Sequence, residues 1–264
     1  MINGRVPFNF GLYACKPNKK LIGIHIKFGV GAVDAVGVLH QITSIFKQYD
    51  LPIINMGISQ NEPSYAFIFL DISENESLDV KELTSKIENI PFVDDVKLIE
   101  PPFRGFIFDP YFFPFKIRGE RALIFLRRTY EGLIKLTREK IGSGFKAILF
   151  HIGFDIGFHV FKKAHIHIAG KDPRKLIETV KAFFQLLGYG IIREITFDMD
   201  KSEAIVKVDK CFECEMLIGS KEAEAHFVRG MFAGWFSQLF GKKVNVIETK
   251  CIAKGDEYCE FHVS

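Results

Sequence analysis

Residues 244–263 read VNVIETKCIAKGDEYCEFHV, and they are the most informative stretch of the 264-residue chain. Apolar and β-branched residues dominate both ends of the stretch, and Gly255-Asp256-Glu257 between them favours a turn. The pattern predicts a terminal hairpin in which residues 244–253 pair with residues 258–263. A hairpin at this position makes the C-terminal half of the chain a domain with an antiparallel sheet.

The same hairpin carries three side chains of types that bind metals, Glu248, Cys251 and Cys259. Thiolates and carboxylates bind Zn²⁺ at about 2.0–2.3 Å. Side chains alternate along a regular strand, so Glu248 and Cys251 can share an ion only if a bulge or twist separates them. A three-residue turn places Cys251 and Cys259 on one face as diagonal neighbours, whereas a two-residue turn makes them face apart. The spacing is therefore compatible with a metal site.

The rest of the C-terminal half predicts helices around further strands. Apolar residues at helical spacing mark the helices, and Asp172 and Gly188 are start and stop signals for one of them. Gly153 and Gly157 indicate close packing points within another. The predicted helices are 121–141, 147–161, 173–187 and 227–240, and the predicted strands are 191–197, 204–208 and 212–217. We expect an α+β domain with helices on one face of an antiparallel sheet.

The N-terminal half shows a second pattern, in the order strand, helix, strand, strand, helix, strand. The strands are predicted at 21–26, 53–59, 65–72 and 93–99, and the helices at 38–46 and 80–90, with Asp34 as a cap before the first helix. This order is the ferredoxin-like split βαβ arrangement. We therefore divide the chain into an arm (1–19), a ferredoxin-like domain (20–100), a linker rich in proline and aromatic residues (101–118) and the C-terminal domain (119–264).

Composition excludes several classes of protein. The chain has 35 Lys and Arg against 32 Asp and Glu, a net charge of +3 that is too small for a direct nucleic-acid footprint. The start of the sequence does not resemble a signal peptide, and charged or polar side chains interrupt the longest apolar segment, so no membrane span is predicted. Five cysteines in such a sequence favour free thiols or metal ligands in a reducing, cytoplasmic setting. The 28 phenylalanines either line an apolar cavity or fill a core.

Residues 34–42 read DAVGVLHQI, a glycine-containing turn into the first predicted helix. With the strand and helix order around it, this segment resembles the ACT domain family over residues 20–100, although Val36 stands where relatives often carry proline. The resemblance implies an amino-acid effector, or dimerisation, at this turn, with Asp34 and Gly37 as binding residues. The alternative is that Gly37 only permits close packing of the helix.

The terminal hairpin, together with RGMFAG at 229–234 and GYG at 188–190, resembles the 4-vinyl reductase domain family over residues 119–264. Sensor members of that family bind zinc beside a pocket for aromatic ligands, which implies that Glu248, Cys251 and Cys259 are metal ligands here. Relatives supply a further cysteine where this chain has Ala225. Cys214 is our preferred replacement, and Cys211, His226 and a water molecule are the alternatives. On the predicted strand, the thiols of Cys211 and Cys214 face opposite sides.

Three histidines are candidate ligand-binding residues. His151 and His159 share one face if their segment is helical, and His165 shares a face with His167 if theirs is extended. A histidine that lines a pocket and hydrogen-bonds a ligand hydroxyl is one interpretation. A second metal site, and ordinary surface or core positions, are the others.

These observations predict a non-catalytic regulatory protein that senses a small apolar or aromatic ligand beside a structural Zn²⁺ and modulates transcription or a partner protein. The ACT-like half is expected to form a homodimer or to bind an amino-acid effector. The sequence shows no helix-turn-helix pattern, and no candidate catalytic residue is assigned. The alternatives are a reductase acting on a tetrapyrrole vinyl group, for which no dinucleotide fingerprint is found, a cysteine-based redox switch, and a scaffold that holds an acyl chain.

Overall fold

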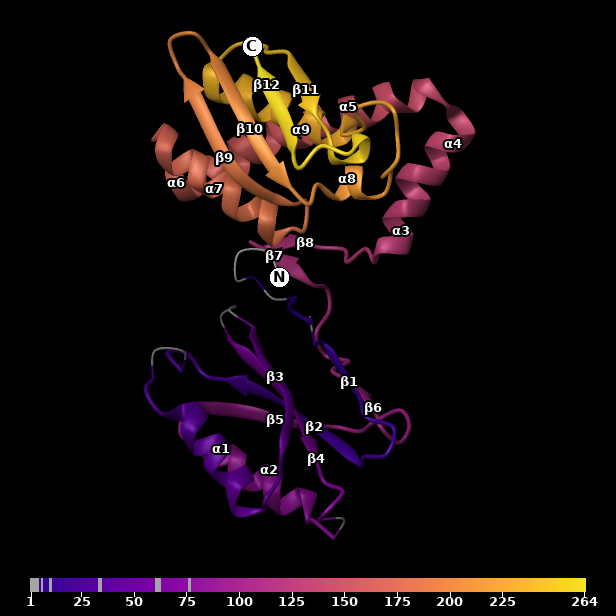
Figure 1. Cartoon of the computed structure of the whole chain (residues 1–264). Coiled ribbons are helices and arrows are strands. Elements are labelled where there is room, and N and C mark those ends of the chain that lie inside the picture. Colours follow the sequence, from indigo (N-terminus) through magenta and orange to yellow (C-terminus); the bar gives the residue numbers. More distant parts are fainter. Residues whose placement is uncertain (1–4, 6, 10, 33–34, 60–62, 76) are drawn as a thin grey trace. The chain divides into compact units, whose positions relative to one another are not determined.

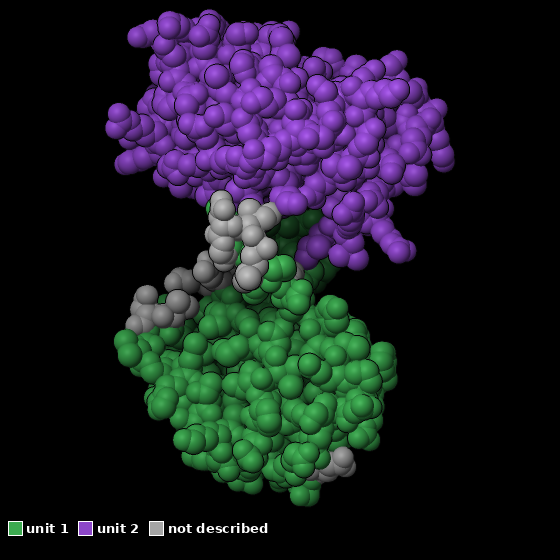
Figure 2. All heavy atoms as spheres, in the orientation of Figure 1, with its two compact units in different colours: residues 1–123 green, residues 124–264 purple. Residues whose placement is uncertain are grey.

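The computed structural model describes the chain except positions 1–4, 6, 10, 33–34, 60–62 and 76, and it separates into two compact units, residues 1–123 and 124–264 (Figure 2). Each unit is a mixed α+β fold around an antiparallel sheet, as the sequence predicts. Among the described helices, none combines the length and the apolar composition that crossing a bilayer requires.

The first unit contains a four-stranded sheet with strand order β3-β4-β2-β5 (Figure 1). Helices α1 and α2 pack on one face of it, through Ile42 and Phe46 of α1 and Leu83 and Ile87 of α2, all fully or almost fully buried. The predicted ferredoxin-like order is confirmed. The elements are β2 (Leu21–Phe28), α1 (Val38–Gln48), β3 (Ile53–Ser59), β4 (Tyr65–Asp71), α2 (Val80–Glu88) and β5 (Val93–Ile99).

The opposite face of this sheet is covered by chain from both flanks of the domain. β1 (Tyr13–Cys15), from the predicted arm, pairs antiparallel with β6 (Phe106–Phe108), from the predicted linker. Ala14 and Ile107 pack there against Leu21, Phe69 and Ile99 in a second apolar cluster. Both flanking segments therefore contribute regular strands and core residues to the unit. β7 (Lys116–Ile117) and β8 (Glu120–Arg121) form a further short hairpin.

A buried ion pair joins this covering chain to the sheet. His25 of β2 and Asp109 lie with Nδ1 and Oδ2 2.7 Å apart, and both side chains are buried. The rings of Tyr65, Tyr111 and Phe112 surround the histidine at 4.9–5.5 Å between centroids. Because a buried polar group needs a partner, the pair fixes the segment after β6 on the sheet.

The second unit contains a four-stranded antiparallel sheet with strand order β11-β12-β10-β9. The predicted C-terminal hairpin is confirmed, with Val246 of β11 opposite Val263 of β12. Alternate residues of β10, Ala204, Val206 and Val208, are buried toward the helices. The strands are β9 (Ile191–Asp198), β10 (Glu203–Asp209), β11 (Val246–Lys250) and β12 (Cys259–Val263).

Helices α7 and α9 pack on one face of this sheet, and α5 packs on α9 (Figure 1). The Asp172 carboxylate accepts hydrogen bonds from the N–H groups of Arg174 and Lys175, which confirms it as the cap of α7. The elements are α3 (Arg127–Glu131), a π-helical segment (Gly132–Leu136), α4 (Thr137–Ile141), α5 (Ser143–Val160), a second π-helical segment (Phe161–His165), α6 (Ile166–Ala169), α7 (Pro173–Leu186), α8 (Phe212–Glu215) and α9 (His226–Phe240).

Two predicted elements in this unit are wrong. The predicted strand 212–217 is a helical turn, α8, because the Glu213 carboxylate turns inward and accepts hydrogen bonds from the first turn of α9. The predicted helix 121–141 begins only at Arg127, since Glu120–Arg121 pairs with β7. Asp34, the predicted cap of the first helix, lies outside the described residues, and Gly37 occupies the N-cap position of α1.

Candidate metal centre and apolar pocket

Four side chains of the second unit converge on one point: Cys214, Glu248, Cys251 and Cys259. One ligand atom from each lies within 4.8 Å of the others. The Cys251 and Cys214 sulfurs are 3.5 Å apart, and the Cys214 sulfur is 3.6 Å from Glu248 Oε1. The three thiols are fully buried, and Glu248 is partly exposed. The structure thus brings together the four residues that the sequence suggests as metal ligands.

Local backbone geometry explains how the hairpin residues meet. The register of β11 against β12 shifts between Glu248 and Lys250, so the irregularity that the alternation of side chains requires is present. β11 ends at Lys250, and a 3₁₀ turn (Ile252–Lys254) follows. The connection is therefore longer than either a two- or a three-residue turn. The backbone N–H of Cys251 donates to Asp256 Oδ2 at 2.8 Å, which holds the turn in place.

The donor set suits a zinc ion. Burial raises the pKa of Glu248 to about 8 and is one of the causes that raise the pKa of Cys259. Three thiols and a carboxylate this close together cannot all ionise without a cation, and a divalent ion supplies that charge. Sulfur and oxygen donors converging in a buried place are the ligands of a tetrahedral structural zinc site. The residues present therefore fit the ion, with these four side chains as its candidate ligands.

The start of helix α9 lies next to this cluster and depends on two carboxylates. Glu248 Oε2 accepts from the N–H of Ala225 at 2.9 Å. The oxygens of Glu213 accept from the N–H groups of Phe227 and Val228, both at 3.0 Å. Because the first N–H groups of a helix have no partner within the helix, these two carboxylates replace a cap that Ala225 cannot supply. Sequence reasoning missed Glu213, because the predicted strand gave no reason to place it in the interior.

Glu213 predicts a pH dependence of stability. Burial raises the pKa of this fully buried carboxyl from 4.5 to about 8, and its two hydrogen bonds oppose that rise. A carboxyl whose pKa is higher in the folded state binds more protons there, so its contribution is complete below about pH 4.5 and disappears as the pH rises through about 8. At ~1.4 kcal/mol per pKa unit, we expect metal-free protein to lose on the order of a few kcal/mol between about pH 5 and 9.

Urea unfolding at a series of pH values measures this loss. Because Trp235 is the single tryptophan of the chain and belongs to the second unit, its fluorescence reports that unit alone. Glu213→Gln should flatten the pH profile in part, since Glu248 contributes in the same direction. Glu215→Gln, a control in the same short helix, should leave the profile unchanged. An unchanged profile in Glu213→Gln contradicts the prediction.

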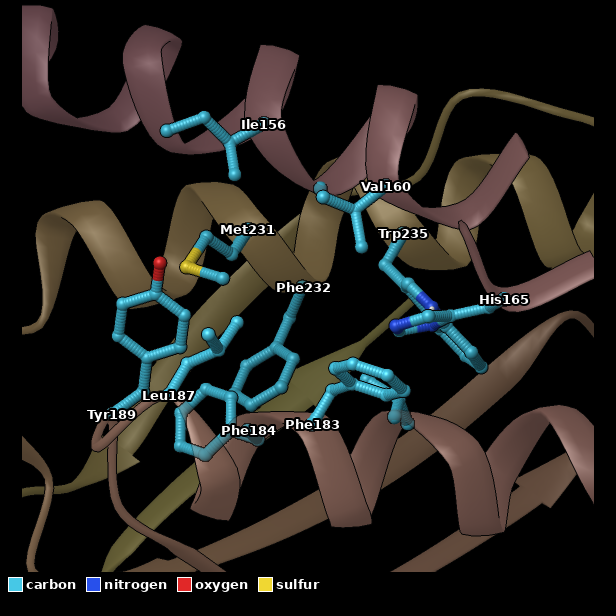
Figure 3. Close-up of a pocket in the computed structure, with 12 residues that line it drawn as sticks. Ile156, Val160, His165, Phe183, Phe184, Leu187, Tyr189, Met231, Phe232 and Trp235 are labelled. Carbon is cyan, nitrogen blue, oxygen red and sulfur yellow. Dashed lines mark hydrogen bonds between the residues drawn. The ribbon is translucent and has the colours of Figure 1, made fainter. Parts of the chain in front are cut away.

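An apolar pocket lies between α5, α7 and α9 (Figure 3). It has a volume of about 50 Å³. Figure 3 shows the Tyr189 ring at one end and His165 beside Trp235 at the other, with Met231 and Phe232 between them. The lining residues are Ile156, Gly157, Val160, His165, Val180, Phe183, Phe184, Leu187, Tyr189, Met231, Phe232 and Trp235.

The polar groups of the pocket are few. The indole Nε1 of Trp235 donates to Nδ1 of buried His165 at 2.8 Å. Burial raises the pKa of the Tyr189 hydroxyl at the other end. Among the described residues that line the pocket, none is acidic. An apolar lining with a small number of polar groups is typical of sites that bind small organic molecules.

The structure separates the other candidate binding residues. His165 lines the pocket, whereas His151 and His159 are exposed on α5 and are not among the lining residues. His165 and His167 lie in helical rather than extended chain, so they do not share a strand face. Gly37, in the first unit, has a φ of 94° and open space beside it. Its conformation accounts for a glycine at the start of α1 without a close packing contact.

Comparisons with known proteins agree with the division of the chain. Residues 204–264 match the family model of the vinyl-4-reductase (V-4-R) domain. Two Methanocaldococcus jannaschii proteins, MJ0150 and MJ0745, are 33% and 31% identical over 122 and 116 residues, which are 46% and 44% of this chain. The matched regions span 66% and 54% of those relatives' own lengths.

Solved structures give more distant likenesses. The phenol-responsive sensory domain of the transcription activator PoxR is 15% identical, with a TM-score of 0.48 over 55% of this chain and 77% of that one. A vinyl-4-reductase family protein from Methanocaldococcus jannaschii is 21% identical, with a TM-score of 0.39 over 54% and 83%. The C-terminal part of the chain, at residues 204–264, is thus similar in sequence to vinyl-4-reductase domains.

Proposed function

We propose that the chain is a non-catalytic sensor whose second unit binds a small apolar or aromatic molecule. The observation that supports this proposal most directly is the apolar pocket between α5, α7 and α9. Transfer of an apolar ligand into such a lining is favourable by about 25 cal/mol per Å² of buried surface. The absence of acidic side chains among its described lining residues supports binding rather than acid–base chemistry.

The chemistry of the pocket favours an aromatic ring that carries one hydroxyl. Stacked and edge-on rings line it, and the His165–Trp235 pair or the Tyr189 hydroxyl supplies a hydrogen-bonding partner for the ligand hydroxyl. The pocket volume of about 50 Å³ is smaller than the roughly 150 Å³ cavity that binds benzene in another protein. Binding of a ring therefore requires a lining side chain to move. Met231 is suited to this movement because its side chain is unbranched and flexible.

The proposed metal ion is structural. Cys214, Cys251 and Cys259 supply three ligands, and Glu248 or Cys211 supplies the fourth. Four protein ligands leave no open position for a reactive water. The ion would join α8 to the terminal hairpin, and Glu248 would connect this centre to α9, which also lines the pocket. We infer that the metal keeps the pocket wall in place rather than taking part in a reaction.

The first unit has a regulatory role in this proposal. The ferredoxin-like fold around Gly37 would form a homodimer or bind an amino-acid effector at the start of α1, as the ACT resemblance implies. The small net charge of the chain argues against direct contact with nucleic acid. Regulation of transcription or of an enzyme would therefore pass through a partner protein.

A titration of the intact protein with phenol tests the sensor proposal. Because Trp235 is the single tryptophan and lines the pocket, its fluorescence should change in a saturable way as the ring binds. Val160→Phe should weaken this response at least tenfold, because the larger ring occupies the pocket, while Ile152→Phe on the exposed side of the same helix should not. Native mass spectrometry of the purified protein should show the mass of any retained ligand. The absence of a response to phenol, with no retained ligand, contradicts the proposal.

A redox switch is the second candidate, and one observation favours it. Cys211, Cys214, Cys251 and Cys259 are all fully buried, and their thiols interact with one another. Loss of the metal would leave these thiols close enough to oxidise to a disulfide. Titration of thiols with and without a strong chelator separates the two candidates. A switch requires fast, reversible loss of thiols after exposure to peroxide, whereas a purely structural centre resists it.

A further inference from the structure

Helix α8 changes how the Cys211-x-x-Cys214 pair should be understood. On a strand the two thiols face apart, but Cys211 is the N-cap of α8 and Cys214 lies within the helical turn. Both side chains are fully buried, and their thiols interact with each other. Two cysteines separated by two residues in a tight turn are a common half-site for structural zinc. The helical turn thus makes Cys211 a fifth donor beside the four that already converge.

The four thiols form a closed set of contacts. Cys211 interacts with Cys214 and with Cys259. Cys251 also interacts with both, and its sulfur lies 3.5 Å from that of Cys214. Cys214 and Cys259 interact across the middle of the set. Five of the six edges of a tetrahedron of sulfur atoms are therefore present, with Cys211 and Cys251 at the ends of the remaining edge.

Glu248 has another role that the thiols cannot perform. Its Oε2 accepts the backbone N–H of Ala225, the N-cap residue of α9, at 2.9 Å. Ala225 has no side chain that caps the helix, so this carboxylate satisfies an N–H group that otherwise has no partner within the helix. A carboxylate also interacts favourably with the positive end of a helix. The thiol of Cys211, in contrast, interacts with the other cysteines of the cluster.

We propose that Cys211 is the fourth metal ligand, so that four thiolates bind the ion and Glu248 acts as the cap of α9. The inference rests on the proposed function, because it presumes that the cluster binds a metal. It makes the centre a pair of cysteine half-sites, Cys211/Cys214 from α8 and Cys251/Cys259 from the terminal hairpin. The ion then links two parts of the chain that are far apart in sequence.

X-ray absorption at the zinc edge, measured on the intact zinc-loaded protein, tests the ligand set without any substitution. We expect a shell of four sulfurs at about 2.3 Å and no oxygen at about 2.0–2.2 Å. A shell of three sulfurs and one oxygen, with stoichiometric zinc, overturns this inference and leaves the proposed centre intact. Failure of the wild-type protein to take up zinc contradicts the metal centre of the proposed function itself.

Three variants extend the test. Cys211→Ser should replace one sulfur of the shell with oxygen and weaken zinc binding at least tenfold, while Glu248→Gln should keep four sulfurs. Cys15→Ser, which changes the exposed cysteine of the first unit, is the matched control and should alter neither value. An unchanged shell in Cys211→Ser, or loss of a ligand atom in Glu248→Gln, overturns the assignment.

Discussion

Gly157→Ala is expected to destabilise the second unit by about 3 kcal/mol or more, at the upper end of the cost of inserting a methyl group into a close-packed interior. A Cβ at this position would lie 2.0 Å from the carbonyl oxygen of Met231 in α9. The obstacle is backbone, so α5 must move away from α9 to accept the methyl group. The gain of ~1 kcal/mol in helix propensity from Gly to Ala offsets only part of this cost.

The close approach of the two helices is reciprocal. Gly153 of α5 meets the carbonyl of Phe227, and Gly230 and Gly234 of α9 meet the carbonyls of Phe150 and Phe154, at 2.0–2.1 Å from an added Cβ. Four glycines on two facing helices therefore set the distance between α5 and α9. Since both helices also line the pocket, displacing them should change the Trp235 emission as well.

Gly144→Ala is the matched control, because Gly144 lies in α5 with no atom within 4 Å of an added Cβ. It should stabilise the unit by about 0.5–1 kcal/mol. Urea unfolding followed through Trp235 measures both variants in the second unit alone. A change of less than about 0.5 kcal/mol in Gly157→Ala contradicts the close packing of α5 and α9.

Those parts of the fold that depend on local patterns were predictable from the sequence. Helix α7 has its cap, Asp172, its first-turn proline, Pro173, and Gly188 after its end within one stretch. The strand 212–217 was mispredicted because Phe212, Cys214 and Met216 alternate as in a strand, while a distant contact of Glu213 with α9 decides the conformation. The pairing of β1 with β6 joins segments far apart in sequence, which no local pattern reveals.

The candidate site shows the same division. Glu248, Cys251 and Cys259 were singled out because their spacing lies within one hairpin. The choice between Cys214 and Cys211 depends on the conformation of α8, and the loss of the predicted strand reopened it. The pocket could not be predicted, since its wall combines α5, α7, α9 and the chain around His165 and Tyr189. Even within α5, periodicity placed His151 and His159 on one face without showing that this face is exposed.

Removal of the metal is expected to lower the stability of the second unit by about 4 kcal/mol when the free ion is present at ~1,000 times its dissociation constant, because the ion binds the folded state alone. Without it, three buried thiols lose their common partner, and the connection between α8 and the terminal hairpin rests on packing and hydrogen bonds. The measurement is urea unfolding of the intact protein with and without a strong chelator, followed through Trp235. Elemental analysis before and after treatment establishes the metal content.

Cys259→Ser separates loss of the metal from other effects of the chelator. The variant should resemble chelated wild-type protein in stability, and the chelator should have no further effect on it, because one of the shared ligands is gone. Cys15→Ser should keep both the stability and the chelator response of the wild type, since Cys15 is exposed in the first unit. A chelator that removes stoichiometric metal without lowering the stability of the second unit contradicts a structural role for the ion. A stable unit also depends less on the metal if Glu213 and Glu248 are protonated, so we expect the chelator effect to grow as the pH rises toward about 8.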